Sequence, residues 1–166
     1  MSAKQYAWKG AGVTLRTIEE KDATDIVQWR NDPAVYLFFK TPKEITVQEH
    51  LEWYRTAYLN NENRIDFIVE TREDKGVGTA GIEWDPQEGQ AEVSYLIRRE
   101  YRRRGLAGEA LETLCAHAAL VWPVKVFRAT IHEDNVPSQK FITAQGFKQY
   151  NREGRFITFV KEVPDL

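Results

Sequence analysis

Residues 95–108 read Tyr-Leu-Ile-Arg-Arg-Glu-Tyr-Arg-Arg-Arg-Gly-Leu-Ala-Gly, and they join a predicted strand at 91–97 to a predicted helix at 106–121. The first amides of a helix have no partner within the helix and its dipole is positive there, so anions bind at this end. Gly105 has no Cβ, which lets a phosphate approach the backbone and permits a positive φ. Five arginines gather at the same end: Arg98, Arg99, Arg102, Arg103 and Arg104. The segment predicts a pyrophosphate-sized anion site; the alternative is a solvated, arginine-rich loop that merely begins a helix.

Two familiar phosphate-binding motifs are absent. No G-x-x-x-x-G-K-[ST] run occurs, which excludes a P-loop nucleotide site. No G-x-G-x-x-G follows the first predicted strand, 13–16, so a dinucleotide fingerprint is absent as well. The anion site around Gly105 therefore points to another class of protein.

The spacing of apolar residues divides the rest of the chain into helices and strands. A recurrence every three or four positions predicts helices at 17–31, 46–58, 106–121 and 135–145. Alternation of apolar and polar residues predicts strands at 13–16, 65–69, 76–84, 91–97, 124–131, 147–150 and 156–160. Short turns in the middle of the chain predict an antiparallel meander. This order favours a mixed sheet with helices packed on it over an alternating doubly wound fold.

Composition limits the possible classes further. The 166 residues are 42% hydrophobic and 29% charged, which suits one domain with a core. A net charge of −2 argues against a nucleic-acid coat or a polybasic membrane binder. Cys115 is the only cysteine, which excludes an internal disulfide framework and a cysteine-rich zinc site. No apolar run approaches the ~20 residues of a membrane span, so we expect a cytoplasmic protein with no membrane or nucleic-acid partner.

Two motifs carry a resemblance to a known family. Arg102-x-x-Gly105-x-Ala107 resembles the [QR]-x-x-G-x-[GA] acetyl-CoA loop of the GNAT superfamily of N-acetyltransferases. Residues 135–147, Asn-Val-Pro-Ser-Gln-Lys-Phe-Ile-Thr-Ala-Gln-Gly-Phe, resemble the family's N-x-x-S/A…G-F segment after its fifth strand. The pattern is similar to two branches, the ribosomal-protein N-terminal acetyltransferases and the enzymes that acetylate nucleotide-linked amino sugars.

The resemblance covers nearly the whole chain and implies its fold. We expect an α+β fold, an α/β/α sandwich with a mixed, mostly antiparallel seven-stranded sheet and about four helices. Residues 1–166 would form a single N-acetyltransferase domain. The fourth and fifth strands would splay apart and admit the pantetheine arm of acetyl-CoA between them.

The same resemblance implies which residues bind acetyl-CoA, with no metal involved. The backbone of Leu96, Ile97 and Arg98 would bond the pantetheine and polarise the thioester. The loop that begins the long helix would hold the pyrophosphate through Arg102, Arg103, Arg104, Gly105, Leu106 and Ala107. Asn135 and Ser138 would contact the donor from the other side, and Asn135 is also suited to cap the following helix.

Catalysis would be direct attack of a neutral primary amine on the acetyl carbonyl, which requires a base or a water chain. Glu92 is the first candidate base and Glu83 the second, although either could be a carboxylate that merely faces water. Many family members place a tyrosine on the helix after the fifth strand as the general acid. Here that position holds Phe141-Ile142, and Ser138 is the best substitute. Because a serine hydroxyl is a weak acid, the alternatives for Ser138 are an orienting role and an ordinary place in the first turn of a helix.

The acceptor is expected near the first two helices, where Trp29, Arg30 and Trp53 are candidate substrate-binding residues. The alternative for the two tryptophans is ordinary packing in the core. Candidate acceptors are a small amine, an amino sugar or a peptide or protein N-terminus. A non-catalytic acyl-CoA-binding module of the same fold is the alternative function, and both a monomer and a homodimer fit the family.

Overall fold

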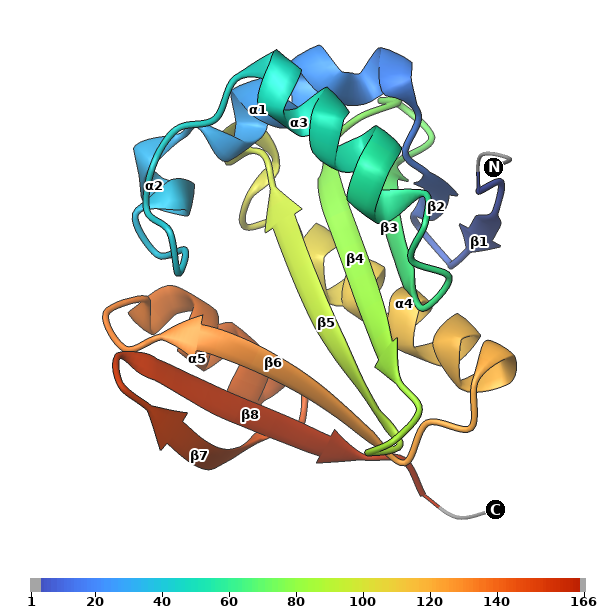
Figure 1. Cartoon of the computed structure of the whole chain (residues 1–166). Coiled ribbons are helices and arrows are strands. Elements are labelled where there is room, and N and C mark those ends of the chain that lie inside the picture. The colour runs from blue at the N-terminus through green and yellow to red at the C-terminus, as the bar shows by residue number, and fades with distance from the viewer. Residues whose placement is uncertain (1–3, 165–166) are drawn as a thin grey trace.

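A computed structural model describes residues 4–164, and its centre is one eight-stranded sheet (Figure 1). The strands lie in the order β1-β2-β3-β4-β5-β6-β8-β7. Neighbours pair antiparallel except β5 and β6, which are parallel. The bounds are β1 (Ala7–Lys9), β2 (Thr14–Thr17), β3 (Arg64–Glu70), β4 (Gly78–Asp85), β5 (Gln90–Ile97), β6 (Val126–His132), β7 (Lys148–Glu153) and β8 (Phe156–Glu162).

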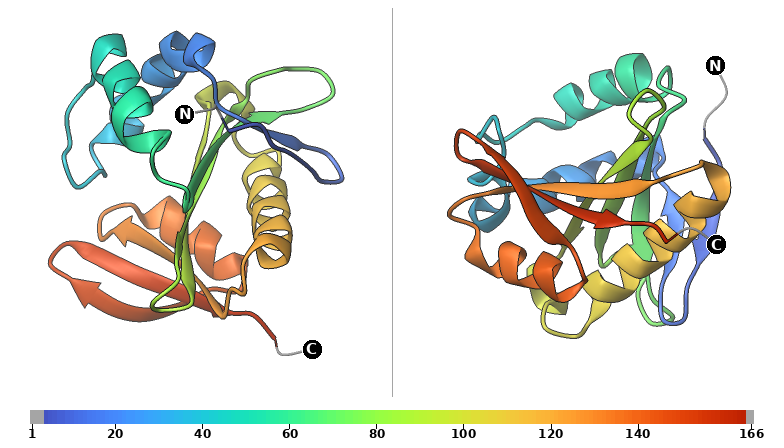
Figure 2. Two further views of the ribbon diagram at one scale, coloured as in Figure 1. Left: turned by 45° about the vertical axis from the view of Figure 1, so that its right-hand side comes forward. Right: turned by 90° about the horizontal axis from the view of Figure 1, so that it is seen from below.

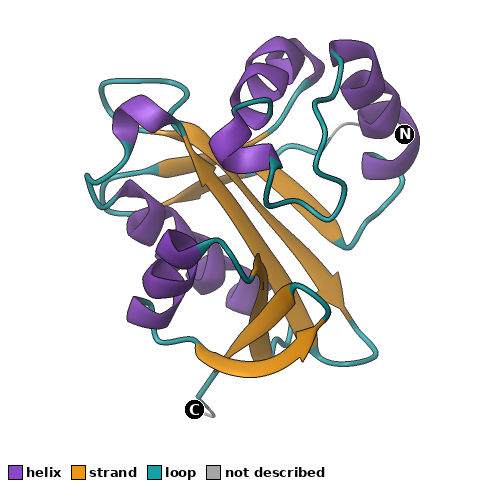
Figure 3. Cartoon of the chain, turned by 90° about the vertical axis from the view of Figure 1, so that its left-hand side faces the viewer, coloured by secondary structure: helices purple, strands orange, loops and turns teal. Residues whose placement is uncertain are grey.

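Helices cover both faces of the sheet (Figure 2). They are α1 (Ala23–Arg30), α2 (Pro33–Tyr36), α3 (Val47–Trp53), α4 (Leu106–Val121) and α5 (Val136–Ala144). In Figure 1, α1 and α3 lie over one face of β3 to β5, and α4 lies over the opposite face. Figure 3 shows helices on both sides of the strands. The predicted sandwich of helices on a mixed, mostly antiparallel sheet is therefore confirmed.

The alternation of residues along β3 explains why both faces carry helices. Phe67 and Val69 are fully buried in the larger core, which also contains Leu114 of α4. Ile68 points to the other face, where it packs with Tyr54 and Tyr58 in a second, smaller cluster under α1 and α3. A strand in the middle of a sheet that is apolar on both faces must be covered on both.

The element count differs from the prediction of seven strands and about four helices. The structure adds β1 and α2, and both are too short for periodicity to reveal. In β1 only Trp8 is buried, and α2 is a four-residue helix that Asp32 caps ahead of Pro33. The predicted helix at 46–58 is α3 followed by a π-helical turn at Tyr54–Tyr58.

The feature that matters most for function is the separation of β5 from β6. The two strands pair only at Gln90↔Val126, Ala91↔Phe127 and Glu92↔Arg128, and they diverge beyond that point (Figure 1). The far edge of β6 remains fully paired with β8 from Val126 to His132. The splayed strands expected from the resemblance are therefore present, and the edge of β5 from Val93 to Ile97 faces an opening.

Candidate functional site

A cleft of about 840 Å³ occupies the opening between β5 and β6. One wall is the strand edge from Glu92 to Ile97, and the other is Ala129–His132 with the start of α5. Arg102, Arg103 and Ala107 close one end of the cleft. One cavity is thus surrounded by the three segments that were expected to bind a common ligand. They are the edge of β5, the arginine-rich loop and the start of α5.

The loop at the start of α4 has the backbone geometry of an anion site. Arg103 and Gly105 both adopt positive φ, 65° and 76°, and left-handed residues of this kind occur in the concave backbone turns that bind anions. A Cβ added to Gly105 would meet no protein atom within 4 Å. Glycine is favoured here by the backbone conformation, and the space above it is open.

The five arginines of this segment divide into two groups. Three stabilise the loop itself: Arg98 donates to the Gly76 carbonyl at 2.7 Å, Arg99 binds Asp32 at 2.8 Å, and the Nε of Arg102 donates to the Ile97 carbonyl at 2.9 Å. Arg103 and Arg104 form no ion pair with a residue in the range 4–164. Arg103 lines the cleft, and the guanidinium of Arg104 lies over the ring of Tyr101, 5.3 Å from the ring centroid.

The backbone of Arg98 is engaged on both sides. Its amide donates to the Val77 carbonyl at 2.8 Å, and its own carbonyl accepts from Tyr101 at 2.9 Å. Leu96 and Ile97 line the cleft, so they are better placed than Arg98 to offer backbone groups to a ligand there.

A pair of hydroxyl groups joins the two walls of the cleft. Asn135 caps α5, where its Oδ1 accepts from the Ser138 amide at 3.3 Å. The Oγ of Ser138 lies 2.7 Å from the phenol oxygen of Tyr95, which comes from β5. Burial raises the pKa of Tyr95 to about 12, so its hydroxyl stays protonated at neutral pH.

The family pattern predicts a hydroxyl-bearing tyrosine on the helix that follows the fifth strand. The tyrosine that meets Ser138 lies on β5 instead, and it was not predicted. Alternation along the strand places Tyr95 on the same face as Val93, toward α4 and α5. Its ring packs edge-on against Phe141, with ring centroids 5.0 Å apart. The odd–even alternation of the strand could have shown which face Tyr95 occupies. It could not have shown the contact with Ser138, which is 43 residues away in the sequence.

The two predicted carboxylates lie side by side across the sheet, on the face opposite Tyr95. Glu83 and Glu92 are register partners on β4 and β5. Arg128 binds Glu92 at 3.0 Å, and Arg64 lies 3.9 Å from Glu83. Glu92 lines the cleft, at the point where β5 and β6 begin to diverge, whereas Glu83 lines neither the cleft nor the cavity described next.

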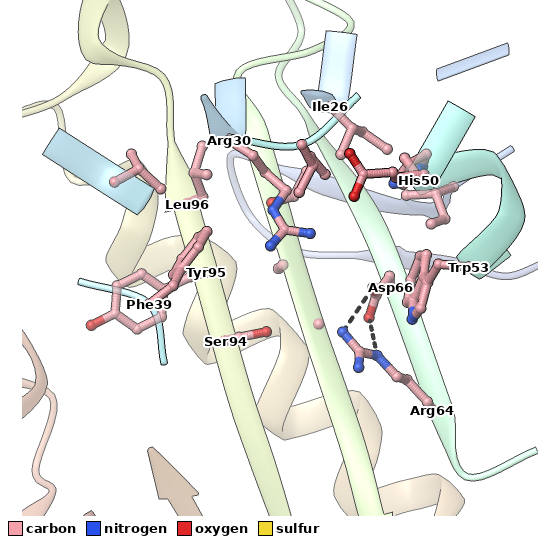
Figure 4. Close-up of a pocket in the computed structure, with 17 residues that line it drawn as sticks. Ile26, Arg30, Phe39, His50, Trp53, Arg64, Asp66, Ser94, Tyr95 and Leu96 are labelled. Carbon is pink, nitrogen blue, oxygen red and sulfur yellow. Dashed lines mark hydrogen bonds and ion pairs between the residues drawn. The ribbon is translucent and has the colours of Figure 1, made fainter. Parts of the chain in front are cut away.

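A second cavity, of about 540 Å³, lies between the helices α1 and α3 and the face of β3, β4 and β5 that they cover (Figure 4). It shares Val35, Phe39, Ser94, Tyr95 and Leu96 with the cleft, so the two adjoin along β5. Of the three predicted substrate-binding residues, Arg30 and Trp53 line this second cavity. Trp29 does not; its ring lies under the Arg98 guanidinium, 5.3 Å from the ring centroid, beneath the arginine-rich loop.

Three further polar residues line this cavity. Arg64 and Asp66 come from β3 and are paired through two contacts of 3.1 and 3.3 Å. His50 comes from α3, is 4% exposed, and has no hydrogen-bond partner for either ring nitrogen among the described residues. Burial, assisted by the charge of Arg30, lowers the pKa of His50, so the ring is neutral at pH 7. Arg64 and Asp66 were not predicted as cavity residues because they sit in a strand pattern that looks structural on its own.

Neither a metal site nor a membrane segment is evident in the described part of the chain. Within residues 4–164, no group of three or more histidine, cysteine, aspartate or glutamate side chains is arranged to hold a metal ion. Over the same range, no helix is both long and apolar enough to cross a bilayer.

The family of this chain follows from a comparison with known proteins. The Acetyltransferase (GNAT) domain family matches residues 13–148, so the chain belongs to the GNAT acetyltransferases. Acetyl-CoA-dependent acyl transfer is the chemistry of that family, so the predicted enzyme class and co-substrate are confirmed at the level of this domain.

Two sequence relatives are each 28% identical to the chain. One is an uncharacterized protein of Methanocaldococcus jannaschii, matched over 91% of this chain but only 31% of its own length. The other is an uncharacterized N-acetyltransferase of Bacillus licheniformis, matched over 82% of this chain and 79% of its length. The chain thus spans less than a third of the first relative.

A solved structure of the ribosomal-protein alpha-N-acetyltransferase RimL in complex with coenzyme A has the same fold. Its TM-score is 0.81 over 95% of this chain and 98% of that one, at 13% identity.

Proposed function

We propose that this protein is an N-acetyltransferase that transfers the acetyl group of acetyl-CoA to a primary amine. The observation that supports this most is the meeting of two cavities along Ser94–Leu96 of β5. One has an anion-binding loop at its end and an open strand edge along its side, which suits a long phosphorylated donor. The other has polar side chains and suits the amine.

In this proposal the donor lies in the cleft between β5 and β6. The amides from Arg103 to Ala107 bind the pyrophosphate, and the side chains of Arg103 and Arg104 add positive charge. The open edge of β5, including Leu96 and Ile97, bonds the pantetheine arm as an added strand would. Asn135 contacts that arm from the side of α5.

The chemical step moves one acyl group and one proton. The amine nitrogen forms a bond to the acetyl carbon while the bond from that carbon to sulfur breaks. Glu92, acting through water, takes the proton that the nitrogen loses. Ser138, held by Tyr95, gives a proton to the departing sulfur, and the Tyr95 hydroxyl is positioned to replace it.

The acceptor class is the finer part of the proposal. Solved structures of this fold include a spermidine N-acetyltransferase from Vibrio cholerae and a nucleotide-linked-sugar enzyme, both 17% identical to this chain. Likeness at that identity extends to the fold alone. A small amine, an amino sugar and a peptide N-terminus therefore all enter the first screen.

The test is release of free thiol from acetyl-CoA in the presence of a panel of primary amines. We expect turnover with at least one amine class. Binding of CoA without thiol release from any amine would instead support a non-catalytic acyl-CoA-binding module.

Glu92→Gln, with Glu83→Gln as the matched control, tests the base. We expect Glu92→Gln to lower kcat about 100-fold near pH 7. The loss should shrink near pH 10, where a much larger fraction of an alkylamine with a pKa of about 10.4 is already neutral in solution than at pH 7. Glu83→Gln should stay near wild type, and equal effects of the two variants would exclude the assignment of Glu92.

A further inference from the structure

The second cavity contains an arginine that forms no direct ion pair with a carboxylate of the described residues. Arg30, the last residue of α1, is half-buried, and its guanidinium reaches into the cavity (Figure 4). No carboxylate within residues 4–164 lies within 4.0 Å of it. Its guanidinium lies over the ring of Phe39, 4.9 Å from the ring centroid.

The acidic side chains around the cavity are already occupied. Both oxygens of Asp66 accept from Arg64. Glu49 is exposed, where one of its oxygens accepts from the Thr46 amide at 3.0 Å and the other lies 3.9 Å from the Lys43 ammonium. Asp66 is close enough to act on the charge of Arg30, but both of its oxygens are bonded to Arg64, so Arg30 has no carboxylate of its own in the cavity.

His50 adds a second, independent observation. It lines the same cavity, is almost fully buried, and leaves both ring nitrogens without a partner among residues 4–164. A neutral imidazole carries one N–H donor. A buried donor without an acceptor costs free energy, and an acceptor oxygen bound in the cavity would remove that cost.

On the basis of the proposed function, we infer that the acceptor is a primary amine that also carries an oxyanion, a carboxylate or a phosphate, and that Arg30 binds this oxyanion. A guanidinium pairs with either group through two parallel hydrogen bonds, and burial strengthens that pairing. The cavity volume of about 540 Å³ suits a small metabolite. A polyamine fits poorly because its second ammonium would meet Arg30 and find no unpaired carboxylate.

The test uses substrate pairs that differ only in the oxyanion. The carboxylate arm compares amino acids with their amides. The phosphate arm compares glucosamine 6-phosphate with glucosamine, and spermidine represents the polyamines. We expect kcat/KM for the anionic member of one arm to exceed that of its neutral partner by about 10- to 100-fold. The arm with the larger ratio identifies the oxyanion.

The variant Arg30→Met should reduce that ratio to near one, and Arg30→Lys should restore part of it. Arg55→Met is the matched control, since Arg55 is exposed and pairs with Glu20 outside the cavity; it should leave the ratio unchanged. Thermal stabilisation by CoA verifies that each variant is folded.

Equal turnover of both members of each pair, preference for spermidine, or an unchanged ratio in Arg30→Met would each overturn the inference. If no amine releases thiol, the proposed function fails separately. Calorimetric binding of the same pairs to CoA-saturated protein then decides the role of Arg30. Absence of any anion preference in that binding would also overturn it.

Discussion

The assignment of the arginine-rich loop as the pyrophosphate site is tested most directly at Gly105, through Gly105→Glu. The residue has φ of 76°, and a side chain there would project into open space rather than into the protein. The left-handed conformation costs an L residue about 1–2 kcal/mol, which for a domain of this size corresponds to a fall in Tm of roughly 2–8 °C. The fold should therefore survive, and any large effect should fall on the ligand.

The effect on CoA affinity comes mainly from charge. A carboxylate about 6 Å from a phosphate oxygen repels it by about 3 kcal/mol at an effective dielectric constant near 20. Because each 1.4 kcal/mol is a factor of ten, Gly105→Glu should weaken CoA binding by more than about 100-fold. The neutral Gly105→Gln should lose less, because it keeps the bulk without the charge.

Isothermal titration with CoA measures the affinity, and Gly154→Glu is the control. Gly154 also has a positive φ, 59°, and also has no atom within 4 Å of an added Cβ, but it lies in the turn between β7 and β8. It should show a similar fall in Tm with unchanged CoA affinity. Wild-type affinity in Gly105→Glu, or equal losses in both variants, would refute the assignment of the loop.

Two further predictions concern the hydroxyl pair and the buried histidine. Tyr95→Phe removes the 2.7 Å contact with Ser138, so kcat should fall by about 3- to 10-fold. CoA affinity, measured by titration, should stay within about twofold; an unchanged kcat would exclude the positioning role of Tyr95. The pKa of His50 is lowered in the folded state. Below about pH 6.5 the unfolded chain therefore binds a proton on His50 more readily than the folded chain does, and stability falls as the pH is lowered. The loss of Tm between pH 7.5 and pH 5.5 should be smaller in His50→Gln than in wild type; equal slopes in the two melting series would contradict the shift.

Much of the fold could be predicted because its signals are local. The apolar recurrence that predicts helices at 106–121 and 46–58 appears within a few residues, and the structure has a helix in each place, α4 and α3. The elements that were missed, β1 and α2, are three and four residues long and too short for any period.

The candidate site was predictable only in part, because its residues acquire their roles from distant partners. Arg30 and Arg64 look alike in the sequence, yet only Arg64 forms a direct ion pair with Asp66. Trp29 and Trp53 also look alike, yet only Trp53 reaches the second cavity. Which arginine stays unpaired and which ring lines a cavity depends on the packing of α1 and α3 over β3.

The sequence by itself was enough to predict an anion-binding loop, because a helix start, a glycine and clustered arginines are all contained in residues 98–107. It also determined the order of helices and strands that identifies the family. Only the tertiary structure decided where β5 leaves β6, which hydroxyl meets Ser138 and which charge remains unpaired in the second cavity. These features depend on contacts between segments far apart in the chain, and hydrophobic spacing carries no information about such partners.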